Sequence, residues 1–147
     1  MDLSQSQSKF NIFLSYDNKN KEKVIELREY LKSEGLTVWM DKEQMPNGFI
    51  NDLLYAGVRN SDLFLCCLTE NYPQRDNCKL ELNLAHAYGK KILTVFFDNQ
   101  NMSYSDILKK YEGVGFFFAG KIIYKITDIN KLKNGIISAL KDLVTLK

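Results

Sequence analysis

Hydrophobic residues follow two patterns that alternate along the chain. Short, nearly continuous apolar runs are typical of strands buried on both faces of a parallel sheet, whereas apolar residues that return every three or four positions are typical of amphipathic helices. The apolar runs predict strands over residues 10–16, 36–41, 63–68, 91–97 and 121–126. We expect the last of these strands, KIIYKI, to lie at an edge of the sheet.

Helical spacing fills the segments between the predicted strands. Val24, Leu27 and Leu31 share one helix face, and Gly35 suits the cap that ends this helix. Further helices are predicted over residues 50–58, 77–91 and 103–112 and from residue 129 onward. Alternating strands and helices with short connections predict an α/β fold, with one parallel sheet and helices on both of its faces. In such folds, ligand sites lie at the carboxyl ends of the strands.

The overall composition is that of one ordinary globular domain. The 147 residues are 45% hydrophobic and 26% charged, and a chain of this length buries roughly two-thirds of the surface that it exposes when unfolded. Residues 1–9, MDLSQSQSK, are polar and lack the apolar centre of a signal peptide, so we expect a short disordered leader and one domain over residues 10–147. No apolar run approaches the roughly 20 residues of a membrane span.

Charge and cysteine usage narrow the range of partners. The net charge is only +2 and the chain has three arginines, so we do not expect nucleic-acid binding, which favours arginine for phosphate and guanine contacts. The three cysteines, two of them adjacent, fit neither a disulfide framework nor a zinc-binding pattern. We therefore expect no bound metal and a reduced, cytoplasmic setting.

One acidic residue, Glu81, lies on the apolar face of the helix predicted over residues 77–91. Successive residues advance by roughly 100° around a helix, which places Lys79, Asn83 and His86 on the water-facing arc and Glu81 near the middle of the opposite arc. A buried carboxylate without partners is costly, so Glu81 must form hydrogen bonds, become protonated or face a cleft. Two interpretations stay open: a structural acid near the helix N-terminus, and a functional carboxylate.

Four segments of the chain resemble the Toll/interleukin-1 receptor (TIR) domain. They are, in order, NIFLSYDNKNKEKVIELREYL, GLTVWMDKEQM, RNSDLFLCCLTENY and NCKLELNLA, and the resemblance covers roughly residues 10–145. It implies a flavodoxin-like, three-layer fold with five parallel strands in the order 2-1-3-4-5. It also implies a role in signal transduction and innate immunity, in which TIR domains associate with themselves or with one another through a loop, here residues 42–49.

The VWMD segment resembles NAD-cleaving TIR domains more than receptor adaptors. In enzymatic members, a glutamate three residues after the cysteine of this helix is catalytic, and here Glu81 follows Cys78 at that spacing. The helix-face pattern selects the same residue without reference to the family. Two positions depart from the family pattern: Asn77 stands where many members have tryptophan, and Asp17 stands where some enzymatic members have arginine.

The resemblance implies that the chain hydrolyses NAD+ to nicotinamide and ADP-ribose, or to cyclic products, with NAD+ as substrate and no further cofactor. Breaking the nicotinamide–ribose bond creates positive charge on the ribose, as in glycoside hydrolysis, and a carboxylate such as that of Glu81 would stabilise this charge. The alternative function is a non-enzymatic adaptor that acts through TIR–TIR association.

Further residues are candidates for substrate binding: Ser15, Tyr16, Asp17, Trp39, Phe49 and Cys78. Ser15 is expected to hydrogen-bond either Glu81 or the ribose. Tyr16, Trp39 and Phe49 offer surfaces for stacking, although core packing is the preferred interpretation for Trp39, because a tryptophan side chain buries a large area. Phe49 would equally suit a contact with the helix that follows it.

Overall fold

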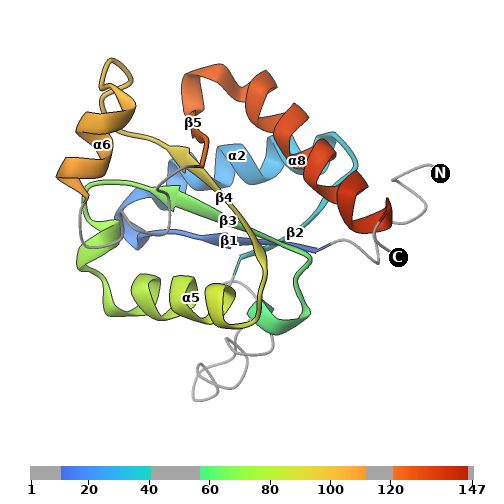
Figure 1. The fold of residues 1–147 in the computed structure, drawn as a ribbon. Helices are drawn as coiled ribbons and strands as arrows, with labels where there is room; N and C mark the ends of the chain where they lie inside the picture. Colours follow the sequence, from blue (N-terminus) through green and yellow to red (C-terminus); the bar gives the residue numbers. More distant parts are fainter. Residues whose placement is uncertain (1–10, 41–56, 112–120, 146–147) are drawn as a thin grey trace.

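A computed structural model describes residues 11–40, 57–111 and 121–145 (Figure 1). The strands are β1 (Asn11–Ser15), β2 (Thr37–Met40), β3 (Leu63–Leu68), β4 (Lys91–Phe96) and β5 (Ile123–Lys125). The α-helices are α2 (Lys21–Ser33), α5 (Asp76–Ala87), α6 (Tyr104–Lys110) and α8 (Ile129–Thr145). Short 3-10 helices form η2 (Asn18–Asn20), η3 (Tyr72–Gln74) and η4 (Ile126–Asp128).

The strands form one parallel sheet in the order β2-β1-β3-β4-β5. The α/β class and this strand order are as predicted, and β5 lies at an edge. The order reverses its direction between β1 and β3, and doubly wound folds bind ligands at such a point, outside the carboxyl ends of the strands. Ser15, the last residue of β1, pairs there with Cys66 of β3.

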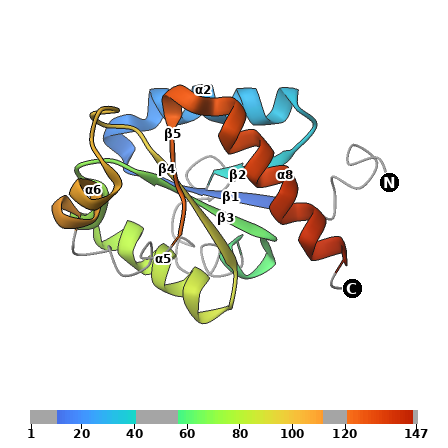
Figure 2. The ribbon, with the colours of Figure 1, turned by 45° about the horizontal axis from the view of Figure 1, so that its top comes forward.

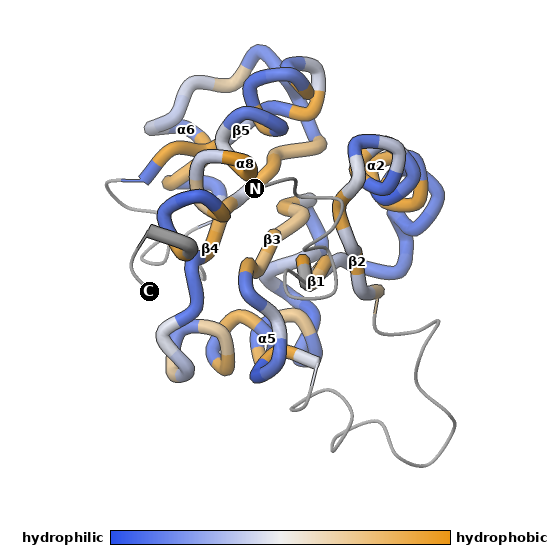
Figure 3. Tube along the Cα trace, turned by 90° about the vertical axis from the view of Figure 1, so that its right-hand side faces the viewer, coloured by the Kyte–Doolittle hydropathy of each residue, from blue (hydrophilic) through white to orange (hydrophobic). Residues whose placement is uncertain are grey.

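Helices cover both faces of the sheet and complete three layers. Helices α2 and α8 pack on one face, while α5 packs on the opposite face together with α6 (Figures 1 and 2). Strand β3 is buried along its whole length, and Figure 3 draws it largely in orange, whereas α2 alternates between polar and apolar residues. Strand β3 is therefore the centre of the fold.

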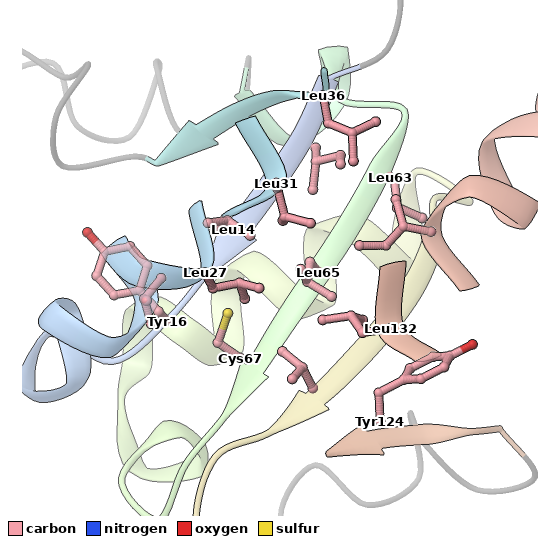
Figure 4. Close-up of a cluster of buried hydrophobic side chains, with 14 of the residues drawn as sticks. Leu14, Tyr16, Leu27, Leu31, Leu36, Leu63, Leu65, Cys67, Tyr124 and Leu132 are labelled. Carbon is pink, nitrogen blue, oxygen red and sulfur yellow. The ribbon is translucent and has the colours of Figure 1, made fainter. Parts of the chain in front are cut away.

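The residues of β3 point alternately into two core clusters. Leu65 and Cys67 belong to the cluster under α2 and α8, which Figure 4 shows in detail. Phe64 and Cys66 belong to the cluster under α5. In the second cluster Phe64 stacks on Phe13 of β1, with ring centroids 5.5 Å apart.

Two glycines end helices at the positions that connect them to strands. Gly35 has φ +86° after α2, as the predicted cap requires, and Gly89 has φ +68° after α5. The N–H of Lys90 bonds the carbonyl of Ala85 at 2.9 Å, which is the pattern of a helix that stops at a left-handed residue. Helix α5 therefore ends at Ala87, and the prediction that it continues to residue 91 was wrong.

Other predicted elements form with shorter bounds, or lie outside the described residues. Helix α6 lies inside the range predicted over 103–112, and α8 places its apolar stripe on the sheet. Among the helices that the structure describes, none is long and apolar enough to cross a membrane. The loop over 42–49, Phe49 within it, and most of the helix predicted over 50–58 lie outside the described ranges.

Candidate active site

Glu81 lies inward on α5, as its helix face predicted. Its side chain is only 2% exposed, although it carries a carboxylate. Cys78, Leu82 and Ala85 share this buried face of α5 and pack toward the sheet. The fold therefore holds Glu81 at the carboxyl end of β1, on the side of the sheet that α5 covers.

A chain of hydroxyl groups reaches the Glu81 carboxylate. Ser15 Oγ donates a hydrogen bond to Glu81 Oε1 at 2.6 Å, and the hydroxyl oxygens of Ser15 and Tyr72 lie 2.7 Å apart. A serine hydroxyl has one proton, and Ser15 gives it to Glu81, so between Ser15 and Tyr72 the donor is Tyr72. The Tyr72 hydroxyl also lies 3.4 Å from the Cys78 carbonyl, a second and more distant acceptor for its proton. Each donation polarises the next one, and a hydrogen bond donated to a carboxylate favours its ionised form.

Burial keeps Tyr72, the first hydroxyl group of this hydrogen-bonded series, protonated. Tyr72 of η3 is fully buried, and this burial raises its pKa well above the ordinary value, with the neighbouring Cys66, Cys78 and Glu81 acting in the same direction. Burial likewise raises the pKa of the Cys66 thiol to about 12. Tyr72 therefore keeps its phenolic proton at physiological pH.

A pocket of about 370 Å³ lies beside Glu81. Its described lining comprises Tyr16, Asp17, Asn18, Lys19, Arg75, Asn77, Cys78 and Glu81. These residues come from two segments, the connection that follows β1 and the beginning of α5. The volume lies within the roughly 300–1,000 Å³ that is usual for small-molecule sites, and the pocket lies where the strand order predicts a ligand.

An ion pair joins the two segments across the pocket wall. Arg75 Nε donates a hydrogen bond to Asp17 Oδ1 at 2.9 Å; the Asp17 side chain is 2% exposed, whereas that of Arg75 is 48% exposed. Asp17 precedes η2, but its side chain forms no capping hydrogen bond there. The other carboxylate oxygen, Asp17 Oδ2, is covered and has no hydrogen-bond partner among the described residues.

Family comparison decides what kind of domain carries this pocket. Residues 12–122, more than half of the chain, match the TIR domain. The chain belongs to the TIR domain family. No curated protein sequence matches this TIR domain.

Solved structures share the fold of this TIR domain. The TIR domain of the Toll-related receptor TRR-2 from Hydra magnipapillata superposes with a TM-score of 0.65 at 14% identity, covering 89% of this chain and 95% of that chain. The TIR domains of the activated Roq1 resistosome, which directly recognises the pathogen effector XopQ, superpose with a TM-score of 0.59 at 18% identity, covering 94% and 85%. At these identities the likeness establishes the fold alone.

Tyr16 and Cys78 line the pocket of this TIR domain in different ways. The Tyr16 ring is 5% exposed and packs near Leu14 and Leu27 in the cluster under α2 (Figure 4). Its backbone carbonyl accepts a hydrogen bond from Cys78 Sγ at 3.4 Å. Substrate binding by either residue stays a prediction.

Trp39 takes part in core packing. Its ring lies 5.0 Å from that of Phe13, centroid to centroid, and a Cβ added at Gly57 would come within 2.7 Å of it. Trp39 packs against the cluster under α5 and is absent from the described lining of the pocket. This placement agrees with the preferred sequence interpretation, while a role in substrate binding stays a prediction, as it does for Phe49.

Two residues of the site were not singled out from the sequence. Tyr72 and Arg75 lie in and just after η3, and their contacts depend on how η3 packs beside β1. Pro73 lies near the beginning of η3, and Arg75 is one of only three arginines, which are weak signals. Within the described ranges, no group of His, Cys, Asp or Glu side chains has the arrangement to hold a metal ion.

The raised pKa of Cys66 predicts a loss of stability in alkali. An unfolded cysteine ionises near pH 9.0, whereas Cys66 in the folded protein stays protonated up to about pH 12. Between these values the folded state holds more protons, so the free energy of unfolding falls with rising pH, by about 1.4 kcal/mol per pH unit for this one group. Urea titrations between pH 8 and pH 11 measure this slope, to which the other buried groups with raised pKa also contribute.

Replacing Cys66 by alanine isolates its share of the slope. We expect Cys66→Ala to reduce the alkaline slope by about 1.4 kcal/mol per pH unit. Ile92→Val, which trims a buried side chain that does not titrate, should lower stability without changing the slope. An unchanged slope in Cys66→Ala would contradict the prediction.

Proposed function

We propose that this TIR domain cleaves the nicotinamide–ribose bond of NAD+, releasing nicotinamide and ADP-ribose. The observation that carries the proposal is the carboxylate of Glu81, held by Ser15 at the wall of a pocket at the carboxyl end of β1. Membership of the TIR family, some of whose members cleave NAD+, supports it. NAD+ is the substrate in this proposal, and the residues of the pocket do the chemistry.

Bond cleavage needs stabilisation of a cation rather than a strong acid. The electron pair of the C1′–N bond leaves with nicotinamide, which becomes neutral, and positive charge develops at C1′ and the ring oxygen of the ribose. The negative charge of Glu81, fixed by the Ser15 hydrogen bond, stabilises this charge as it forms. Water then adds at C1′ and releases a proton. Cyclic products form when a nucleophile within the same molecule reaches C1′ before water does.

We also propose that the activity requires self-association of the chain. The TIR domains of Roq1 were solved in an activated resistosome, which is an assembled state of that protein. For this chain we place the contact in the loop over residues 42–49, as the family resemblance implies. Activity should therefore depend on the concentration of the protein as well as on that of NAD+.

The test is nicotinamide release from NAD+ by the purified chain. The protein is assayed over a wide range of concentrations, in dilute solution and with a neutral crowding polymer, and the products are separated by chromatography. We expect nicotinamide and ADP-ribose in equal amounts when no cyclic product forms, with a rate that rises more steeply than the protein concentration. Absence of nicotinamide at the highest concentration, with polymer present, would refute the enzymatic function.

One observation favours the alternative, a non-enzymatic adaptor that acts by TIR–TIR association. Glu81 is only 2% exposed, and its carboxylate accepts a hydrogen bond from Ser15, as expected for a purely structural acid. Under this alternative the chain self-associates in light scattering or sedimentation, but it releases no nicotinamide. The same protein sample, measured by both methods, separates the two functions.

A further inference from the structure

The Asp17 carboxylate is held in a way that folding alone does not require. Its oxygen Oδ2 is covered without a hydrogen-bond partner among the described residues, and leaving a buried polar atom unsatisfied destabilises the folded state. The side chain does not cap η2, although Asp17 occupies the capping position. Asp17 also lines the same pocket as Glu81, so a ligand there is the natural partner for the unsatisfied oxygen.

The acidic residues of this pocket are buried, whereas its cationic residues are exposed. The two carboxylates, those of Asp17 and Glu81, are each 2% exposed, whereas the cationic residues of the lining, Lys19 and Arg75, are exposed. Buried carboxylates accept hydrogen bonds from hydroxyl groups, and exposed cations bind phosphate. A matching ligand therefore places hydroxyl groups inside the pocket and an anionic group at its rim.

A ribose 5-phosphate unit has this distribution, with hydroxyl groups on the sugar ring and a phosphate on a short arm. We infer that the pocket recognises its ligand through such a unit, with Asp17 Oδ2 accepting a hydrogen bond from the ribose 2-hydroxyl. Arg75 orients Asp17 through Nε and has its terminal nitrogens to offer to the phosphate. The exposed side chains of the rim adjust as the ligand enters, since rotamer changes are common on binding.

This inference rests on the proposed function, because NAD+ contains two such units and Glu81 would act on the ribose of one of them. It adds the part of the substrate that is recognised and two residues that recognise it. Its consequence is selectivity between sugars. A ligand that lacks the ribose 2-hydroxyl cannot donate this hydrogen bond to the charged Asp17, so it should bind less tightly.

The experiment compares ribose 5-phosphate with 2-deoxyribose 5-phosphate, titrated into the labelled chain and followed by NMR shifts of residues around the pocket. We expect the ribose compound to bind about tenfold more tightly, the effect of one hydrogen bond to a charged group. Equal affinity of the unaltered chain for the two sugars would overturn the inference without any variant.

Two variants assign the roles. Asp17→Asn, which has nearly the same shape, should reduce the preference for ribose to about twofold or less, because an amide nitrogen can replace the acceptor oxygen. Arg75→Met should weaken the binding of 2-deoxyribose 5-phosphate by about tenfold, since it removes a phosphate contact. It should also lower the preference for ribose, because Asp17 loses the guanidinium group that orients it. A ribose preference that survives in a folded Asp17→Asn protein would overturn the role of Asp17.

A third variant controls for general effects of charge near this helix. Asp76→Asn alters the fully exposed carboxylate that pairs with Lys79 at 3.7 Å, and Asp76 is not part of the described pocket lining. We expect it to change neither affinity. Melting temperatures of all variants establish that they remain folded.

These experiments distinguish a failure of the binding inference from a failure of the proposed catalytic function. Selective binding of ribose 5-phosphate without nicotinamide release from NAD+ would retain the site and reject the glycohydrolase. Nicotinamide release without any preference between the two sugars would retain the enzyme and reject the role of Asp17.

Discussion

Glu81→Gln is expected to lower the rate of nicotinamide release from NAD+ by about 100-fold or more, which is the usual effect of removing one group that stabilises transition-state charge. Glutamine keeps an oxygen that can accept the hydrogen bond from Ser15 Oγ, so the side chain can stay in place while its negative charge is lost. The measurement is the initial rate at saturating NAD+, together with KM. We expect kcat to fall with little change in KM, because the charge acts on the ribosyl cation rather than on the bound substrate.

Glu29→Gln serves as the matched control. Its carboxylate is 57% exposed and pairs with Arg28 on the surface of α2, and exposed pairs of this kind contribute about 0–1 kcal/mol. Its rate should equal that of the unaltered chain. Equal rates for Glu81→Gln and Glu29→Gln would remove Glu81 from the mechanism, even if NAD+ were cleaved.

Phe64→Ala is expected to reduce the free energy of unfolding by about 3–5 kcal/mol. Phe64 is fully buried in the central strand β3 and stacks on Phe13, so its removal leaves a cavity between the sheet and α5. A domain of this kind is stable by only about 5–15 kcal/mol, so the variant loses a large part of its stability. Urea unfolding followed by tryptophan fluorescence and circular dichroism measures the change.

The control for this loss is a large apolar residue on the surface. Ile122 is 60% exposed, and Ile122→Ala should change the free energy of unfolding by no more than about 0.5 kcal/mol. If Phe64→Ala were as mild as Ile122→Ala, the neighbouring side chains would have to fill the space, and the close packing described for this layer would be wrong.

Patterns of local spacing accounted for most of the fold. The unbroken apolar run over 63–68 became a strand with both faces buried, and alternating elements became a parallel sheet. Glu81 was placed inward by helical periodicity alone, and of the two partners expected for Ser15, Glu81 or the ribose, the structure shows the bond to Glu81. These features depend on residues that are close in the sequence or on the periodicity of a helix. Both can be determined from a single sequence.

Features that depend on tertiary placement were missed. Arg75 and Asp17 are 58 positions apart, and only the packing of η3 beside the end of β1 brings them together. Tyr72 reaches Ser15 over a similar separation. The overestimated length of α5 has a local cause, because Gly89 adopts a positive φ that ends the helix.

The distance along the chain between Ser15 and Glu81, 66 positions, has a consequence for how the proposed activity would be lost. No fragment that contains α5 without β1 can present the carboxylate with its serine partner. The proposed activity and the folded structure should therefore be lost with the same denaturant midpoint. A proteolytic fragment that lacks β1 should be inactive rather than partly active.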